Sequence, residues 1–161
     1  GLVYMMAGAN ENLVLIVHNV SRTLGNQLDD RPCKVYTSDM KVRLTPITYV
    51  YPDVAVVCGE AEFEDDEHDV LLNPALIIEV LSSSTENYDR GLKFRRYQQL
   101  ASLQEYVLIA QTSACVERFV RQSDGQWLLK TVEDMSTSIE LPSIGCTLAL
   151  ADVYKKIAFD I

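Results

Sequence analysis

One acidic residue stands inside an apolar stretch that has the length of a single strand. Residues 75–81 read ALIIEVL and follow Pro74, which favours a turn. Because side chains alternate along a strand, Glu79 shares one face with Ile77 and Leu81. A buried carboxylate must lose its charge, pair with a cation or bind a metal. The alternatives are a salt bridge at the strand end and a solvent-facing position at a sheet edge.

A second carboxylate, Asp53, begins another apolar stretch, residues 54–58 (VAVVC), directly after Pro52. Taken alone, an Asp after Pro is most often a turn residue. On a strand next to the one that carries Glu79, however, it would place two carboxylates together. Such a pair repels unless a hard cation lies between them. Mg²⁺ is commonly held by one or two carboxylates with water and a substrate phosphate. Asp53 and Glu79 are therefore predicted to bind Mg²⁺, with Mn²⁺ as a substitute.

A lysine occupies the apolar stripe of a predicted helix. Lys93, Tyr97 and Leu100 follow the i, i+4, i+7 spacing of one helical face. The lysine either extends its ammonium to solvent or reaches the two carboxylates. In the second case it would hold the attacking water and offset negative charge in the transition state. Asp89 lies one turn earlier and is predicted to support Lys93 through an i, i+4 pair, with Tyr97 as a second supporting residue.

The same helix is the most basic segment of an acidic chain. The net charge of the chain is −9, which argues against a general nucleic-acid binder. Residues 88–97 nevertheless hold one acid and four cations, which are Arg90, Lys93, Arg95 and Arg96. Phosphate groups are expected to approach this segment. The three arginines are accordingly the predicted DNA-binding residues.

The acidity is concentrated in residues 60–69 (EAEFEDDEHD), which contain seven acids and no Lys or Arg. A solvated loop is the simplest interpretation of this segment. The alternative is a loop that repels DNA from one face of the molecule or contacts a basic partner.

The remaining pattern predicts elements that would position these residues. Strands are expected at residues 2–7, 33–36, 40–44, 54–58, 75–81, 105–110, 116–121 and 127–132, the last two forming a hairpin through Ser-Asp-Gly. Helices are expected at residues 11–27 after an Asn10 cap, at 85–100, and at 148–157. The order favours a mixed α/β sheet with helices on its faces, in a single domain over residues 1–161. The stretches around positions 54 and 78 are expected to be its central strands.

The cysteines and the apolar runs bear on location. Cys33, Cys58, Cys115 and Cys146 form no CxxC pair, which argues against a zinc site and predicts reduced thiols in a cytoplasmic protein. No run of about 18 apolar residues is present, so no membrane span is expected. The first residues show neither the basic nor the apolar part of a secretion signal.

Two other catalytic classes find little support. A Ser/His/Asp hydrolase needs a histidine beside a nucleophile, but the chain has only His18 and His68 and no GxSxG turn. The glycines are scattered rather than gathered in a phosphate-binding loop.

The motifs together resemble a known family. Pro52-Asp53, then Glu79-Val80-Leu81-Ser82, then Asp89 with Lys93 and Tyr97, are similar in order and spacing to the Uma2 family of restriction-endonuclease-like proteins. That family belongs to the PD-(D/E)XK superfamily and is abundant in cyanobacteria. The resemblance covers nearly the whole chain, with further similarity at residues 5–9, 31–33, 38–42 and 105–109.

The resemblance implies a restriction-endonuclease-like fold and a metal held by Asp53 and Glu79. In the usual superfamily pattern a lysine follows the acid by two positions, where this chain has Leu81. The family's following helix would instead supply the lysine, which here is Lys93.

The expected function is thus a Mg²⁺-dependent endonuclease that hydrolyses DNA phosphodiester bonds. The alternative is a catalytically inactive module that binds nucleic acid or protein through the same fold. Cleavage of both strands would require two active sites, so a homodimer is expected. The hairpin around Gly125 and the Trp127 strand is the candidate interface, although core packing is the simpler interpretation of Trp127.

Overall fold

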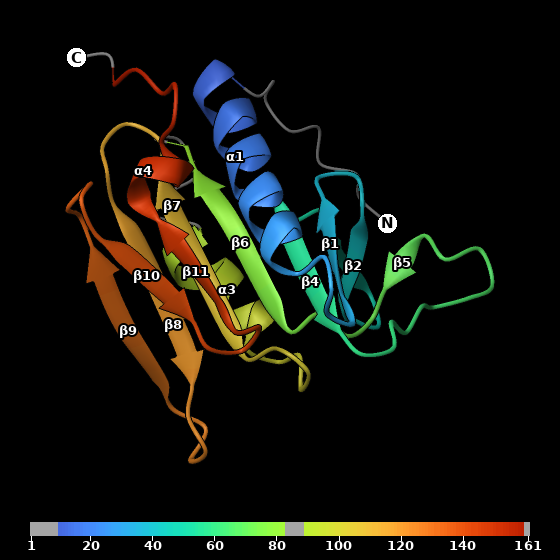
Figure 1. Cartoon of the computed structure of the whole chain (residues 1–161). Coiled ribbons are helices and arrows are strands. Elements are labelled where there is room, and N and C mark those ends of the chain that lie inside the picture. Colours follow the sequence, from blue (N-terminus) through green and yellow to red (C-terminus); the bar gives the residue numbers. More distant parts are fainter. Residues whose placement is uncertain (1–9, 83–88, 160–161) are drawn as a thin grey trace.

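A six-stranded mixed sheet forms the centre of the computed structural model, which describes residues 10–82 and 89–159 (Figure 1). Its strand order is β1-β4-β6-β7-β8-β9. Strands β6 and β7 are parallel, and the other neighbouring pairs are antiparallel. These strands are β1 (Cys33–Thr37), β4 (Val54–Cys58), β6 (Leu76–Leu81), β7 (Glu105–Ala110), β8 (Val116–Arg121) and β9 (Trp127–Val132).

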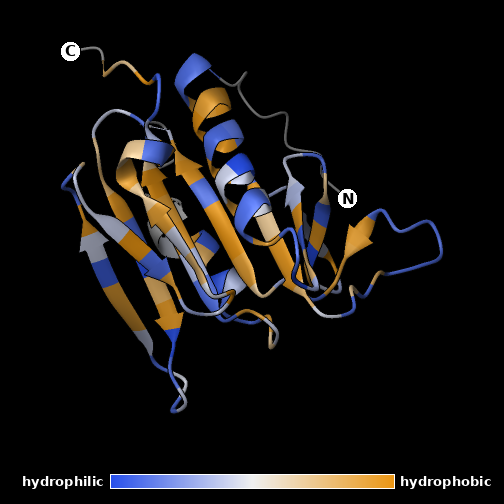
Figure 2. Cartoon of the chain, in the orientation of Figure 1, coloured by the Kyte–Doolittle hydropathy of each residue, from blue (hydrophilic) through white to orange (hydrophobic). Residues whose placement is uncertain are grey.

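The two stretches that carry the candidate carboxylates are central strands, as the sequence predicts. Every residue of β6 is buried, and so are the first four residues of β4. Both strands are strongly hydrophobic in Figure 2. Their burial on both faces follows from layers that cover the sheet on each side.

One face of the sheet is covered by α1 (Glu11–Gln27). The Asn10 side chain accepts a hydrogen bond from the Leu13 N–H at 3.0 Å, which caps the helix as predicted. The buried residues of α1 join a core that includes β10 (Ser138–Leu141), β11 (Cys146–Ala149) and α4 (Leu150–Val153). No helix in the described part of the chain is long and apolar enough to cross a membrane.

The opposite face is covered by a π-helical turn, η1 (Asp89–Lys93), which continues into α3 (Phe94–Tyr97). A small sheet of order β3-β2-β5 lies beside it, made of β2 (Lys41–Thr45), β3 (Thr48–Val50) and β5 (Val70–Leu71). Phe94 stacks on Tyr106 at 4.8 Å and meets the Trp127 ring at 5.3 Å. Trp127 therefore packs at the margin of this second core.

Some predicted boundaries are wrong. The described part of the predicted helix 85–100 is only η1 and α3, and residues 83–88 lie outside the described residues, as does the predicted strand 2–7. Arg121 explains why α3 ends early, because its Nη2 donates to the carbonyls of Gln98 and Leu100 at 2.9 and 3.0 Å. The predicted helix 148–157 is the single turn α4, since Leu148 belongs to β11.

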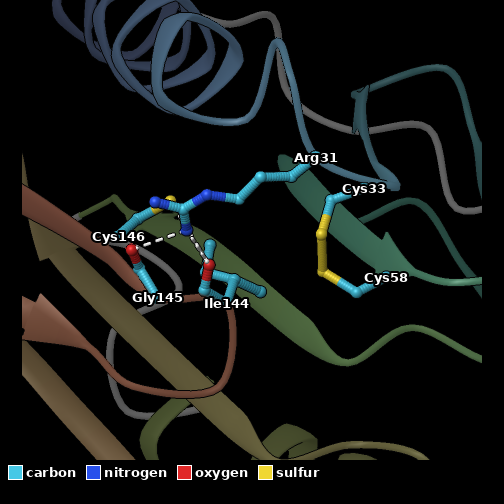
Figure 3. The surroundings of a disulfide bond; sticks show 6 residues. All are labelled: Arg31, Cys33, Cys58, Ile144, Gly145 and Cys146. Atoms are coloured by element: carbon cyan, nitrogen blue, oxygen red, sulfur yellow. Dashed lines mark hydrogen bonds between the residues drawn. A yellow bond between two sulfur atoms is a disulfide. The ribbon is translucent and has the colours of Figure 1, made fainter.

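The prediction that all cysteines are reduced is also wrong. Cys33 and Cys58 form a disulfide between β1 and β4, at positions directly opposite each other in the antiparallel register (Figure 3). Cys115 and Cys146 are free thiols. The two bonded residues are 25 positions apart, so only the pairing of the strands reveals that they meet.

Candidate active site

The register of β4 and β6 brings the two carboxylates together. Val54 lies opposite Ile78, so the residue before Val54 lies opposite the residue after Ile78. These residues are Asp53 and Glu79, and side chains at opposite positions of an antiparallel pair share one face. Both residues are only 4% exposed. The structure thus places the two predicted ligands side by side in a buried position, on the η1 and α3 face of the sheet.

Asp53 is fixed by the backbone of β6. Its Oδ2 accepts a hydrogen bond from the Val80 N–H at 2.7 Å. Burial, and after it the negative charge of Glu79, raises the pKa of Asp53 to about 7, although the Val80 N–H and Lys93 act in the opposite direction. A second positive charge beside this carboxyl would therefore be stabilising.

Glu79 receives two donors on the same oxygen. The Lys93 Nζ lies 2.9 Å from Oε1, and the Tyr97 hydroxyl donates to Oε1 at 2.8 Å. Of the two alternatives for Lys93, the structure shows the one in which the ammonium reaches the carboxylate. The pKa of Tyr97 is raised well above its ordinary value, first by burial and then by Glu79, so the hydroxyl stays protonated as a donor.

The two carboxyl groups are suitable ligands for a hard divalent cation. Hydrogen-bond donors from the described residues reach Oδ2 of Asp53 and Oε1 of Glu79, and a hydrogen bond between the two carboxyl groups also raises the pKa of Asp53. Carboxylate oxygens are the ligands that Mg²⁺ prefers. Lys93 offsets one of the two negative charges, and a cation bound by the two carboxyl groups would offset the other.

The remaining predicted residues differ in exposure and surroundings. Arg95 is exposed and Arg96 is half-buried, both on α3 next to Tyr97. The side chains of Asp89 and Arg90 lie outside the described residues. Leu81, which stands where the superfamily usually has its lysine, is 4% exposed and packs in the core below η1 and α3.

The sequence interpretation missed a third buried acid on this face. Leu108 lies opposite Glu79 on one side and opposite Glu117 on the other. Glu117 therefore shares the face of Glu79, two strands away, and is 7% exposed. Its signal in the sequence is a charged residue directly after buried Val116 in a strand that was interpreted only as half of a hairpin.

The acidic segment 60–69 forms no comparable site. It projects from the body of the molecule beside β5 (Figure 1) and is strongly hydrophilic (Figure 2). Carboxylate oxygens of Asp65, Glu67 and Asp69 lie within 4.8 Å of one another, but all three residues are exposed. Such a cluster is well solvated, which agrees with the simpler interpretation of this loop as a hydrated surface segment.

Comparison with known proteins finds relatives that match most of the chain. Two uncharacterized proteins of Synechocystis sp. are similar: one is 36% identical over 99% of this chain and 83% of its own length, and the other is 37% identical over 87% and 80%. A crystal structure from Anabaena variabilis, described as a "putative nuclease", superposes with a TM-score of 0.78. It covers 94% of this chain and 85% of that chain at 12% identity, so this likeness shows the fold.

The family model Uma2, described as "Putative restriction endonuclease", matches residues 1–151. The mixed α/β fold with helices on both faces agrees with this match and with the Anabaena structure. By its sequence and its fold, the chain belongs to the Uma2 restriction-endonuclease-like family.

Proposed function

We propose that this protein is a Mg²⁺-dependent endonuclease that hydrolyses phosphodiester bonds in DNA. One observation carries the proposal: Asp53 and Glu79 lie opposite each other on neighbouring buried strands, with the Lys93 ammonium 2.9 Å from Glu79. Two acids can hold a catalytic divalent cation, and a nearby lysine can offset negative charge in the transition state. The family match supports a nuclease-like activity.

Each residue has a distinct role in this proposal. Asp53 and Glu79 would hold the cation through their carboxylate oxygens. Bound there, Mg²⁺ would supply Lewis-acid stabilisation of charge on the scissile phosphate. The Val80 N–H and the Tyr97 hydroxyl keep the two carboxylates oriented. Lys93 would hold the attacking water and offset charge in the transition state.

The proposed DNA path follows η1 and α3. Arg95 and Arg96 lie on the short helix that also carries Tyr97, so phosphates drawn to them would arrive at the face of Glu79. Arg90 is proposed to add to this surface. The acidic loop 60–69, on the side of β5, would disfavour DNA there and so restrict the approach.

We propose a homodimer for cleavage of both strands. β9 is the last strand of the central sheet, and an edge strand offers unpaired backbone groups to another chain. Its Leu128 and Leu129 are 57% and 47% exposed. These features support the predicted interface at the hairpin and the β9 strand.

We propose a cytoplasmic location because the proposed DNA substrate lies there. The Cys33–Cys58 disulfide would be an exception in that compartment, where disulfides are rare. Fractionation of intact cells tests the location. Recovery of the protein outside the cytoplasmic fraction would contradict it.

The second candidate is an inactive binding module. The leucine at position 81 and the net charge of −9 favour it. A supercoiled plasmid incubated with the protein and increasing Mg²⁺ or Mn²⁺ separates the candidates. An endonuclease converts the plasmid to nicked or linear DNA only with metal, and Glu79→Gln removes this activity. Binding without cleavage by the wild type, or full cleavage by Glu79→Gln, would reject the proposed catalytic site.

A further inference from the structure

A basic cavity lies on the outer side of α1, on the sheet face opposite Glu79. Its volume is about 190 Å³. The apolar face of α1 packs against the sheet, and the cavity is formed where the other side of this helix meets the chain after α4. The lining residues are Leu15, His18, Asn19, Arg22, Lys155 and Lys156.

The charge of this cavity contrasts with that of the chain. Three of the lining residues are arginine or lysine, a fourth is a histidine, and no acid is among the lining residues. The whole chain carries a net charge of −9. His18 and Arg22 are one helical turn apart, so they extend from the same side of α1. Cations gathered without acids repel one another, and an anion bound between them would remove that repulsion.

The cavity is held together by specific hydrogen bonds. Asn19 Nδ2 donates to the carbonyls of Val153 and Lys155, each at 2.9 Å. Asn12, two helical turns earlier, donates through its Nδ2 to the Ala158 carbonyl at 2.9 Å. These contacts hold the segment after α4 along α1 and keep its two lysines beside the residues of the helix.

The backbone of Lys156, which lines the cavity, has an unusual conformation. Its φ of 65° lies in the left-handed region, which is unfavourable for residues other than glycine, asparagine and aspartate. A helix commonly ends with glycine in this conformation. Here a lysine occupies the position at a conformational cost, and it brings a positive charge to the cavity.

We propose that this cavity binds a phosphate group. Arginine offers a planar fork that matches phosphate oxygens, lysine offers an ammonium, and the imidazole offers a ring N–H. The group would belong either to a small phosphorylated molecule or to a nucleic-acid strand, and the recognition chemistry is the same for both. The site is on the other face of the sheet from Asp53 and Glu79, so the proposal does not depend on nuclease activity.

The test uses the two histidines of the full chain as built-in probes. Inorganic phosphate is added to the metal-free protein at fixed pH, with sodium chloride at equal ionic strength as the reference, and the imidazole ring protons are followed by NMR. The His18 signal should shift in a saturable way. His68 lies in the acidic loop, where its ring stacks on Phe63 at 4.6 Å, and should not shift.

Matched variants sharpen this test. Arg22→Gln, and separately Lys155→Gln with Lys156→Gln, should weaken phosphate binding by about tenfold or more, since each removes a charged donor. Lys34→Gln with Lys130→Gln removes two exposed lysines elsewhere and should leave the affinity unchanged. Unchanged thermal midpoints would show that the variants are folded.

The source of the phosphate is distinguished by three further ligands. In one outcome, a nucleoside 5′-monophosphate competes with inorganic phosphate but an oligonucleotide without a terminal phosphate does not. This outcome indicates that the cavity binds a small phosphorylated molecule or the end of a strand. An oligonucleotide that competes with or without its terminal phosphate indicates backbone binding. Each of three results would overturn the proposal. Phosphate and chloride could give the same response, or the His18 and His68 signals could shift together. In the third case, the cavity variants would bind phosphate as the wild type does.

Discussion

At the scale of single residues, the molecule places charge where burial makes it costly. Asp53, Glu79, Glu105 and Glu117 are all less than 8% exposed. A sequence shows that Glu79 interrupts an apolar strand, but it does not show which cation compensates it. The sequence allowed the Lys93 side chain to point either to solvent or inward. Helical spacing defines only the face of the helix on which a residue lies, not where a long side chain ends. The ion pair between Lys93 and Glu79 becomes visible only when η1 and β6 are packed together.

Asp53→Asn tests the metal through stability. Mg²⁺ that binds only the folded chain should raise the wild-type thermal midpoint by a few degrees when it is in large excess over its Kd. Asp53→Asn should lose this response, because an amide is a poorer ligand and no longer carries charge. Without metal the variant should be at least as stable as wild type, since it removes repulsion with Glu79. Differential scanning fluorimetry with Mg²⁺ and with Na⁺ at equal ionic strength measures both effects.

The exposed Glu133→Gln is the matched control and should keep the full response to Mg²⁺. If Asp53→Asn and Glu133→Gln respond equally, the cation is bound elsewhere on the surface.

Lys93→Ala tests the ammonium beside Glu79. Loss of charge stabilisation in the transition state should lower kcat by about 10²-fold or more, with the metal concentration for half-maximal activity little changed. Lys93→Arg should restore only part of the rate, because a planar guanidinium does not replace a compact ammonium. Initial rates of plasmid nicking give both quantities. Wild-type rates in Lys93→Ala would mean that the ion pair is structural only.

Glu105 permits a prediction of pH dependence away from the candidate site. It is fully buried, its Oε1 accepts from the Ser143 N–H at 2.8 Å, and burial raises its pKa above the usual 4.5. An acid with a raised folded-state pKa contributes stability below its unfolded pKa and loses it as pH rises through the folded value. Glu105→Gln should therefore gain stability relative to wild type between pH 4 and neutral pH.

Urea unfolding across that pH range measures this difference. Gln keeps an acceptor for Ser143, so the comparison isolates the charge. The exposed Glu140→Gln is the control for the change of charge. A falling difference for Glu105→Gln would mean that Arg118, 4.0 Å away, stabilises the ionised form more than burial penalises it.

At the scale of elements, the local sequence was sufficient to predict a helix or strand that is long or has a strong hydrophobic pattern. α1 has its own cap at Asn10 and a complete buried stripe, and β4 and β6 are continuous apolar runs. The short strands β3 and β5 have three and two residues, and their pairing comes from distant partners rather than from their own composition. The early end of α3 likewise depends on Arg121, which is remote in sequence.

The basic helix gives the prediction that belongs to this scale. Replacing both Arg95 and Arg96 with Glu should weaken DNA binding and flatten its dependence on salt, because fewer phosphate contacts release fewer counterions. Lys34→Glu changes the net charge in the same direction at an exposed position of β1 and is the control. Fluorescence anisotropy at several salt concentrations gives the slope. Equal losses per substituted residue in the double variant and the control would indicate a general charge effect and place the DNA path elsewhere.

At the scale of the whole molecule, each chain has one candidate site, whereas cleavage of both DNA strands requires two cuts. The central sheet ends in two edge strands, β1 and β9. β1 is joined to β4 by the disulfide, whereas β9 has exposed Leu128 and Leu129 and no strand beyond it in the described residues. An apolar edge strand is a site where a second copy pairs with least rearrangement. The β9 edge is thus the better supported interface.

Sedimentation is expected to show a homodimer at micromolar concentration. Leu128→Lys with Leu129→Lys should shift it to a monomer, because charges on both faces of the edge strand oppose pairing. Ile47→Lys is the matched control, since Ile47 is 87% exposed in the turn between β2 and β3. The monomeric variant should nick plasmid DNA but no longer produce linear DNA in a single encounter. A monomer that still makes double-strand breaks would refute the link between assembly and cleavage, and a dimer that survives the double substitution would move the interface away from β9.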